Sequence, residues 1–224
     1  MFCLQRLHSA PQIVQKVKVI NSVPRNNLWQ WLTFVWNSRH AHTVPQRVSQ
    51  SRIDQVGPDR ACAEWLMRNG ALVQWKGHSK FVPHYDSLPK DDDPGKYYLQ
   101  EVDATDSSIS HHGFPYFRHC DHVDKIKLQE CLYLDDSALS QLHYLKSSLH
   151  SLSIIKCYGI SKKGLLSLGK LQNLKELQLS GLKSLERNEL DVCIEELSKQ
   201  LPHCEIKVSE NIAKEGSKEE QTDK

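Results

Sequence analysis

Apolar residues in the second half of the chain recur in a fixed pattern, with the spacing L-x-x-L-x-L. Five copies of this pattern begin 24 to 27 residues apart, at Leu99, Val123, Leu149, Leu174 and Leu201. Within each copy apolar positions alternate with other positions, which indicates a short strand with one buried and one exposed face. The rest of each copy is long enough for a helical segment that returns the chain. The pattern therefore predicts repeated strand–helix units that share one parallel sheet.

A period of this length is typical of a leucine-rich repeat and predicts an α/β fold. We expect a short solenoid of about four to five repeats with a curved parallel sheet, formed by residues 97–208. A repeat array needs a cap over its exposed core, and residues 28–96 are expected to form a small helical capping domain. Solenoids present broad surfaces, and the sequence contains no glycine-rich phosphate loop, G-x-S-x-G or H-E-x-x-H motif. We therefore expect a binding protein without catalytic residues.

The capping region contains a helix with clear boundaries. Gly57 stands at the N-cap, Pro58 lies in the first turn, and Gly70 follows the last turn. These are the positions that glycine and proline favour at helix ends. Residues 71–75 are apolar and β-prone, which predicts a strand directly after this helix.

Three of the five tryptophans lie within residues 28–36, at Trp29, Trp31 and Trp36. One interpretation is a buried helix that packs on the open end of the repeats. The other is a membrane anchor or a partner-docking segment, because indole rings favour the headgroup level of a bilayer. The two interpretations are compatible, so these tryptophans are candidate partner-binding residues.

The chain begins with a basic segment. The first 53 residues contain seven Lys or Arg and no Asp or Glu. Such a start is typical of a mitochondrial transit peptide, which we place at residues 1–27; a basic nucleic-acid arm is the alternative. The remaining residues carry more acids than bases, which argues against nucleic-acid binding. Residues 209–224 are polar and charged and are expected to form a disordered tail.

The cysteines and histidines are candidates for disulfide bonds and metal ligands. The seven cysteines include no C-x-x-C pair, which favours buried thiols in a reducing compartment. The histidines at 111–112 and 119–122 are of a type that binds zinc, but their spacing matches no known zinc motif. Solvated loop histidines are the preferred interpretation. No run of 18 apolar residues is present, so we expect any membrane association to be peripheral.

Strand alternation also predicts which side chains lie on the exposed face of the sheet. The candidate partner-binding residues on this face are Glu101, Asp103, Lys125, Lys127, Glu176 and Gln178. Two adjacent lysines among acids make a plausible docking face for an acidic loop or for anionic headgroups. The alternative is a set of ordinary solvated strand residues, since exposed charges contribute little by themselves.

Several stretches of the sequence resemble one protein family. They are residues 54–65, which include Val-Gly-Pro-Asp-Arg-Ala-x-x-Glu-Trp, residues 102–107 (Val-Asp-Ala-Thr-Asp-Ser), Leu88-Pro89 and the aromatic segment 28–36. Together with the short repeats they resemble the mitochondrial coupling factor B family, also called ATP synthase subunit s or distal membrane-arm assembly component 2-like proteins. The resemblance covers residues 28–208, and the stretch at 54–65 is its most specific part.

The resemblance implies a non-catalytic protein on the matrix side of the mitochondrial inner membrane. Its partners would be membrane-sector subunits of ATP synthase, and its role would be to support coupled proton conduction. The resemblance further implies a magnesium ion held by backbone atoms of Gly57 and Lys90. Two alternatives stay open: an assembly factor that binds membrane-arm intermediates of respiratory complex I, and an F-box-type leucine-repeat adaptor.

Overall fold

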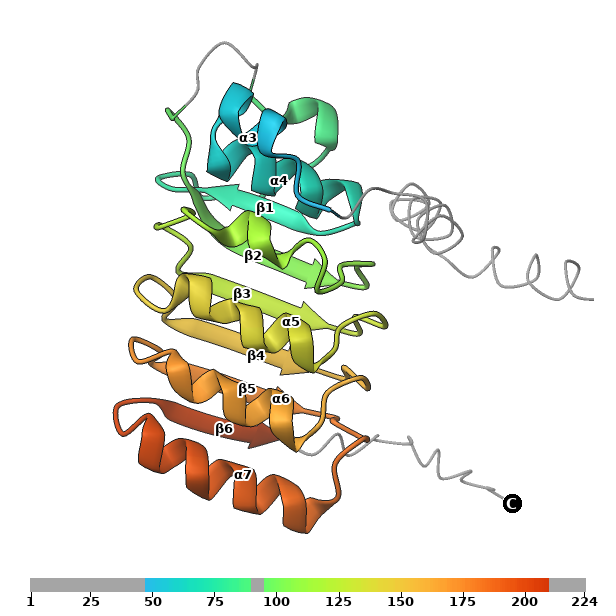
Figure 1. Ribbon diagram of the computed structural model, residues 1–224, viewed down its shortest axis with the longest axis vertical. Helices are drawn as coiled ribbons and strands as arrows, with labels where there is room; N and C mark the ends of the chain where they lie inside the picture. The colour runs from blue at the N-terminus through green and yellow to red at the C-terminus, as the bar shows by residue number, and fades with distance from the viewer. Residues whose placement is uncertain (1–46, 90–94, 210–224) are drawn as a thin grey trace, which may run out of the picture.

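The computed structural model describes residues 47–89 and 95–209. In these residues six strands form one sheet in chain order, antiparallel between the first two and parallel thereafter (Figure 1). The strands are β1 Leu72–Trp75, β2 Leu99–Thr105, β3 Lys125–Gln129, β4 Ser151–Ile155, β5 Glu176–Ser180 and β6 Glu205–Ser209. The predicted α/β class with a mostly parallel sheet is therefore confirmed.

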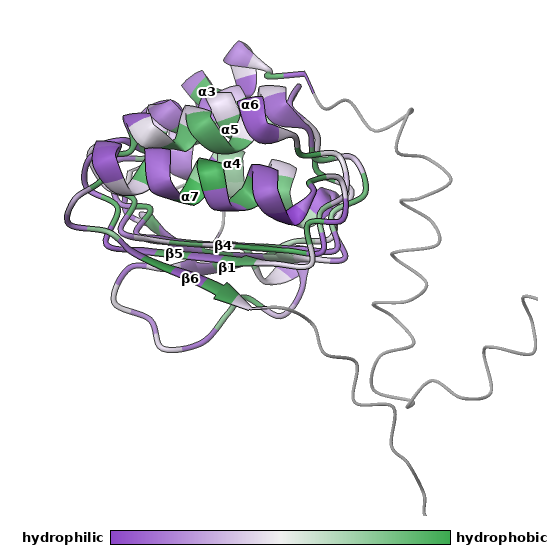
Figure 2. Ribbon diagram, turned by 90° about the horizontal axis from the view of Figure 1, so that it is seen from below, coloured by the Kyte–Doolittle hydropathy of each residue, from purple (hydrophilic) through white to green (hydrophobic). Residues whose placement is uncertain are grey.

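Helical segments connect the strands and cover one face of the sheet (Figure 2). The α-helices are α3 Gln50–Val56, α4 Pro58–Arg68, α5 Asp136–Gln141, α6 Lys162–Ser167 and α7 Arg187–Gln200. The 3-10 helices are η2 Tyr85–Ser87, η3 Phe114–Phe117, η4 Leu142–Leu145 and η5 Leu168–Lys170. Because these connections return on the same side, the opposite face of the sheet carries no helix from residues 47–89 or 95–209.

Strand alternation sends the apolar side chains toward the helices. The inward positions of β2 to β5 are almost fully buried: Val102, Ala104, Ile126, Leu128, Leu152, Ile154, Leu177 and Leu179. They join the leucines that precede the strands and those of the helical segments in one continuous core. Burial of this apolar surface, rather than strand propensity, is what sets the face that each strand presents.

The strand register matches the predicted repeat spacing in four copies and departs from it in the fifth. Lys125 lies opposite Glu101, and Ser151 lies opposite Lys125, as the spacing requires. In β6, however, Ile206 lies opposite Leu177, where the spacing predicted Cys204. The 14-residue helix α7 adds length to this connection. A shift of two residues keeps the same side of the strand toward the core, so the apolar pattern alone could not reveal it.

The helix predicted between Gly57 and Gly70 is confirmed. Helix α4 has Gly57 at its N-cap and Pro58 in its first turn, and Gly70 adopts a φ of 89° after the helix ends. Strand β1 then pairs antiparallel with β2, so one sheet continues across the boundary expected near residue 97. The aromatic ring of Trp65 packs against η3, edge-on to Phe114 at 5.9 Å. This contact fixes the helix on the end of the sheet.

No helix among the described residues is long and apolar enough to cross a membrane. The expected transit peptide at 1–27 and the tryptophan segment at 28–36 lie outside the described residues. Apart from Ser209, the last residue of β6, the expected tail lies outside them as well.

Candidate functional site

The helix-free face of the sheet, called the open face below, carries all six strand residues that the sequence predicted as a docking surface. The register places them in two rows that cross the strands. The first row is Glu101, Lys125, Ser151, Glu176 and Glu205, and the second is Asp103, Lys127, Ser153, Gln178 and Lys207. The structure thus brings the predicted residues together, while their role as docking residues stays a prediction.

Acids of β2 lie beside lysines of β3 on the open face. Lys125 lies 3.9 Å from a carboxylate oxygen of Glu101, and Lys127 lies 3.7 Å from one of Asp103. Both lysines are substantially exposed, so each pair contributes little to folding stability. The ammonium groups can therefore turn toward an acidic partner at small cost.

A third lysine on this face was missed in the sequence. Lys207 donates to Glu176 at 2.8 Å and lies 3.3 Å from Glu205. Its hydrogen bond and charge lower the pKa of Glu176, while that bond, together with one to Glu205, raises the pKa of Lys207. Lys207 was missed because the repeat spacing placed it opposite Ser180, and the two-residue shift in β6 moves it into the second row, opposite Gln178.

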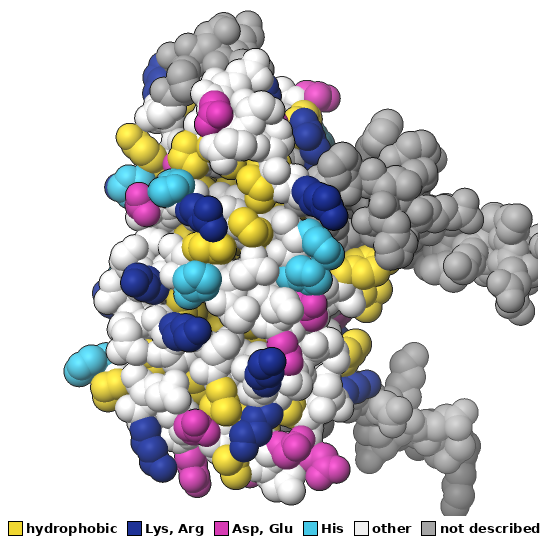
Figure 3. Space-filling view, in the orientation of Figure 1, with side chains coloured by type: hydrophobic (Ala, Val, Ile, Leu, Met, Phe, Trp, Pro, Cys, Tyr) yellow, Lys and Arg dark blue, Asp and Glu magenta, His cyan; other side chains and the backbone are white. Residues whose placement is uncertain are grey.

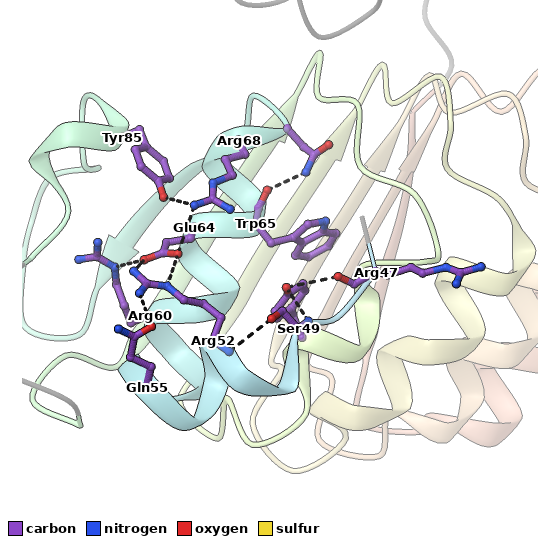
Figure 4. A network of polar contacts seen from close by, with 11 residues as sticks. Arg47, Ser49, Arg52, Gln55, Arg60, Glu64, Trp65, Arg68 and Tyr85 are labelled. Carbon is purple, nitrogen blue, oxygen red and sulfur yellow. Dashed lines mark hydrogen bonds and ion pairs between the residues drawn. The ribbon is translucent and has the colours of Figure 1, made fainter. Parts of the chain in front are cut away.

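A second polar cluster lies in the capping region, around Glu64 of α4 (Figure 4). Arg52 donates from Nε at 3.0 Å and from Nη2 at 2.7 Å to the two oxygens of the Glu64 carboxylate. Arg60, one turn earlier on α4, donates at 2.9 Å, and Arg68, one turn later, lies 3.5 Å away. Burial alone would raise the pKa of Glu64, but the arginine hydrogen bonds hold it below its ordinary value. Three guanidinium groups therefore share one buried carboxylate and tie α3 to α4.

The arginine cluster borders a cleft of about 440 Å³. Its lining includes Arg52, Glu64, Arg68, Trp65 and Tyr116. The Tyr116 ring stacks on Trp65 with centroids 5.8 Å apart, and its hydroxyl accepts the Ser49 backbone N–H at 3.0 Å. The i, i+4 spacing of Arg60, Glu64 and Arg68 was visible in the sequence, but the approach of Arg52 from another helix was not.

Comparison with known proteins gives a consistent result, although no family model matches the chain. The ATP synthase subunit s of Rattus norvegicus is 37% identical over 201 residues, which cover 88% of this chain and 94% of the relative. The human protein of the same name is 38% identical over 183 residues, with 80% and 86% covered. The Mus musculus protein is 35% identical, with 88% and 94% covered. The chain belongs to the mitochondrial ATP synthase subunit s family.

The remaining site predictions for this member of the subunit s family fall partly outside the described residues. Trp29, Trp31, Trp36 and Lys90 all lie there. Gly57 has a φ of 84°, and a Cβ placed on it would lie 3.7 Å from the backbone nitrogen of Gly95, so the two segments meet. The Gly57 carbonyl oxygen accepts the Ala61 N–H at 3.1 Å and retains a second lone pair. Magnesium binding at Gly57 and Lys90 stays a prediction.

Two histidines, His111 and His150, each lie beside a separate carboxylate. His111 lies 2.8 Å from Asp135, and His150 lies 2.5 Å from Asp124. Within residues 47–89 and 95–209, no three or more His, Cys, Asp or Glu side chains are grouped so that they could hold a metal ion. These contacts link successive repeats and do not define a reaction centre.

Two buried cysteines occupy equivalent positions in adjacent repeats of this subunit s family member. Cys131 donates to the Ala104 carbonyl oxygen at 2.9 Å, and Cys157 contacts the Leu128 carbonyl oxygen at 3.6 Å. The neighbouring Cys157 thiol and burial raise the pKa of Cys131 well above its ordinary value. The protonated Cys131 thiol is therefore a small, weakly polar core group that satisfies a backbone carbonyl of the preceding strand.

Proposed function

We propose that this chain is a non-catalytic, mitochondrial component of ATP synthase that binds its membrane sector from the matrix side. Relatives at 35–38% identity that carry the name ATP synthase subunit s are the observation that supports this proposal. In the proposal, residues 97–208 form a leucine-rich-repeat solenoid whose open face docks on the complex. In the proposal, docking supports coupled proton conduction and the chain itself carries out no reaction.

The open face supports this docking role through its shape and its charges. The helix-free sheet offers rows of side chains at the regular spacing of neighbouring strands, about 4.8 Å apart. Lys125 and Lys127 lie on β3, directly beside the uncharged Ser151 and Ser153 of β4. Complementary charges between these lysines and an acidic partner would affect the rate and specificity of association more than its affinity.

Charge reversal on the open face tests the proposal. The double variant Lys125→Glu/Lys127→Glu places four acids on β2 and β3, and we expect repulsion to reduce co-purification with ATP synthase about tenfold. The matched control is Lys162→Glu/Lys163→Glu on α6, which changes the same charge on the helix-covered side. The measurement is the amount of ATP synthase recovered with the tagged chain from mitochondria. Equal recovery with both double variants would contradict docking through the open face.

Loss of the protein tests the coupling role separately. Mitochondria that lack the chain are expected to show proton leak, measured as respiration without ATP synthesis at a given membrane potential. Wild-type chain should restore coupling, and the charge-reversed double variant should not. If respiration stays fully coupled without the chain, the coupling role is wrong even where binding is retained.

A further inference from the structure

The turns after β2 to β5 share one backbone conformation. Three of these turns carry charged side chains along the edge of the sheet. The first residue after each strand has a positive φ: 54° at Asp106, 56° at Glu130, 52° at Lys156 and 63° at Gly181. Each of the three side-chain-bearing residues donates its N–H to the last residue of the next strand, at 2.8 to 2.9 Å. Glycine adopts this conformation without strain, whereas other residues lose about 1–2 kcal/mol each. Asp106, Glu130 and Lys156 thus keep charged side chains at this edge despite the strain.

Exposed apolar side chains lie two residues further along the same turns. The last residues of β3 and β4, Gln129 and Ile155, are paired in the sheet. Leu132 and Tyr158 each follow three residues later, so the register places them next to each other. Leu132 is 61% exposed and Tyr158 is 44% exposed, while Tyr133 is 36% exposed. Leu132, Tyr133 and Tyr158 are called the edge patch below. Figure 3 shows hydrophobic side chains gathered at the right-hand edge, level with the ends of β3 and β4 in Figure 1.

The acidic residues beside the edge patch favour a cationic side chain near Asp106, at the end of β2. Lys156 contacts Glu130 at 2.9 Å and offsets one of the two carboxylates there. The N–H of Asp106 donates to the carbonyl oxygen of Gln129 at 2.9 Å, so Asp106 lies in the turn next to Glu130. Burial together with the charge of Glu130 raises the pKa of Asp106. A cation placed beside Asp106 would relieve this repulsion. At the Tyr158 side of the edge patch, Lys183 Nζ lies 5.7 Å from the centroid of the Tyr158 ring rather than beside Asp106 and Glu130.

The edge patch supplies apolar side chains that the two rows of the open face lack. The two rows of the open face contain only charged or polar side chains from β2 to β6. Stable interfaces depend on a few desolvated aromatic or aliphatic anchors, and rim charges contribute little. Ile155, the last residue of β4, lies on the open face beside Lys156 and connects the two surfaces.

We infer that the edge patch is the apolar anchor of the interface and binds a protein segment presenting an apolar side chain next to a Lys or Arg. The apolar side chain packs on Leu132, Tyr133 and Tyr158, and the cation lies beside Asp106 and Glu130. The inference rests on the proposed function in one respect, because it assigns this segment to an ATP synthase subunit.

Substitution of the edge patch provides the first test, in tagged full-length chain expressed in cells that lack the endogenous protein. Leu132→Asp is expected to reduce recovery of ATP synthase about tenfold or more, because hot-spot anchors contribute at this level. Asp106→Arg is expected to reduce it through repulsion of the partner cation. The matched control is Val192→Asp on α7, where Val192 is 47% exposed and lies outside the edge patch. Circular dichroism melting of each purified variant verifies that it is folded.

Cross-linking identifies the occupant. A photoreactive p-benzoylphenylalanine at position 158 keeps an aromatic ring in the edge patch and is expected to label an ATP synthase subunit at an apolar residue next to Lys or Arg. Labelling of residues 1–46 of the same chain, of a second copy or of lipid would overturn the inference. So would full recovery of ATP synthase with Leu132→Asp. Failure of the wild-type chain to recover ATP synthase would instead contradict the proposed function.

Discussion

Two carboxylates on helix α4 show how single residues determine the behaviour of the capping region. Glu64 is buried among three arginines, which hold its pKa below the ordinary value. Asp59 is also buried and accepts the Leu99 N–H at 2.8 Å, but burial outweighs that bond and raises its pKa to about 6. The difference lies in the partners, because a guanidinium neutralises a buried carboxylate and a single amide does not.

The pKa of Asp59 predicts a pH-dependent stability. A raised folded-state pKa means that the folded state holds a proton which the unfolded state has released, so stability falls as pH rises from about 4 to about 6. The loss is at most about 3 kcal/mol. Asp59→Asn removes this dependence and retains an acceptor for Leu99. Urea unfolding of both proteins at pH 4 and pH 7 should show the variant gaining stability relative to wild type at the higher pH, and a constant difference would contradict the assignment.

Removal of the Glu64 charge should destabilise the capping region. Glu64→Gln removes the negative charge that the three guanidinium groups share, and we expect the free energy of unfolding at pH 7 to fall by about 2–3 kcal/mol. This is at the lower end of the usual range because Arg68 is 55% exposed and partly screened by water. Glu195→Gln on the exposed side of α7 is the control, with an expected change below about 0.5 kcal/mol. A similar small change at Glu64 in chemical denaturation would show that the arginines do not depend on it.

At the scale of elements, the strand pattern predicted β2 to β5 with the correct inward residues, and helix-end residues predicted α4. These elements were predictable because local periodicity and burial agree in them. The register of β6 was not, since a shift of two residues leaves the alternation unchanged. The turns after the strands were also missed, because charged residues such as Glu130 and Lys156 rarely adopt the left-handed conformation seen here.

The close stacking of successive turns predicts a specific sensitivity at Gly159. A Cβ added at Gly159 would lie 2.3 Å from the Leu134 carbonyl oxygen of the preceding repeat, so backbone must move. Gly159→Ala is expected to lower the free energy of unfolding by about 1–3 kcal/mol, as overpacking does elsewhere. Thermal and urea unfolding measure this change. Ser153→Ala on the open face is the comparison, and equal stability of the two variants would mean that neighbouring turns are less tightly packed than the structure shows.

For the whole molecule, the sequence predicted the α/β class, the parallel sheet and the exposed strand residues of the open face, with acids on β2 and lysines on β3. It did not predict the cluster around Glu64, because Arg52 and Glu64 come from different helices and meet only when α3 packs on α4. The edge patch was missed for a similar reason. Leu132 and Tyr158 are 26 positions apart and become neighbours only through the register of β3 and β4. Local patterns specify elements, whereas surfaces made by several elements depend on how those elements pack.

In the proposed interface, the open face and the edge patch together hold this chain on the membrane sector of ATP synthase. Cryo-electron microscopy of ATP synthase isolated with the tagged chain would show which side of the chain makes the contact. We expect density for the sheet with the open face and the ends of β3 and β4 turned toward the complex, and helices α5 to α7 turned away. Contact through the helix-covered side, or a complex without the chain under conditions that preserve its partners, would refute the proposed interface.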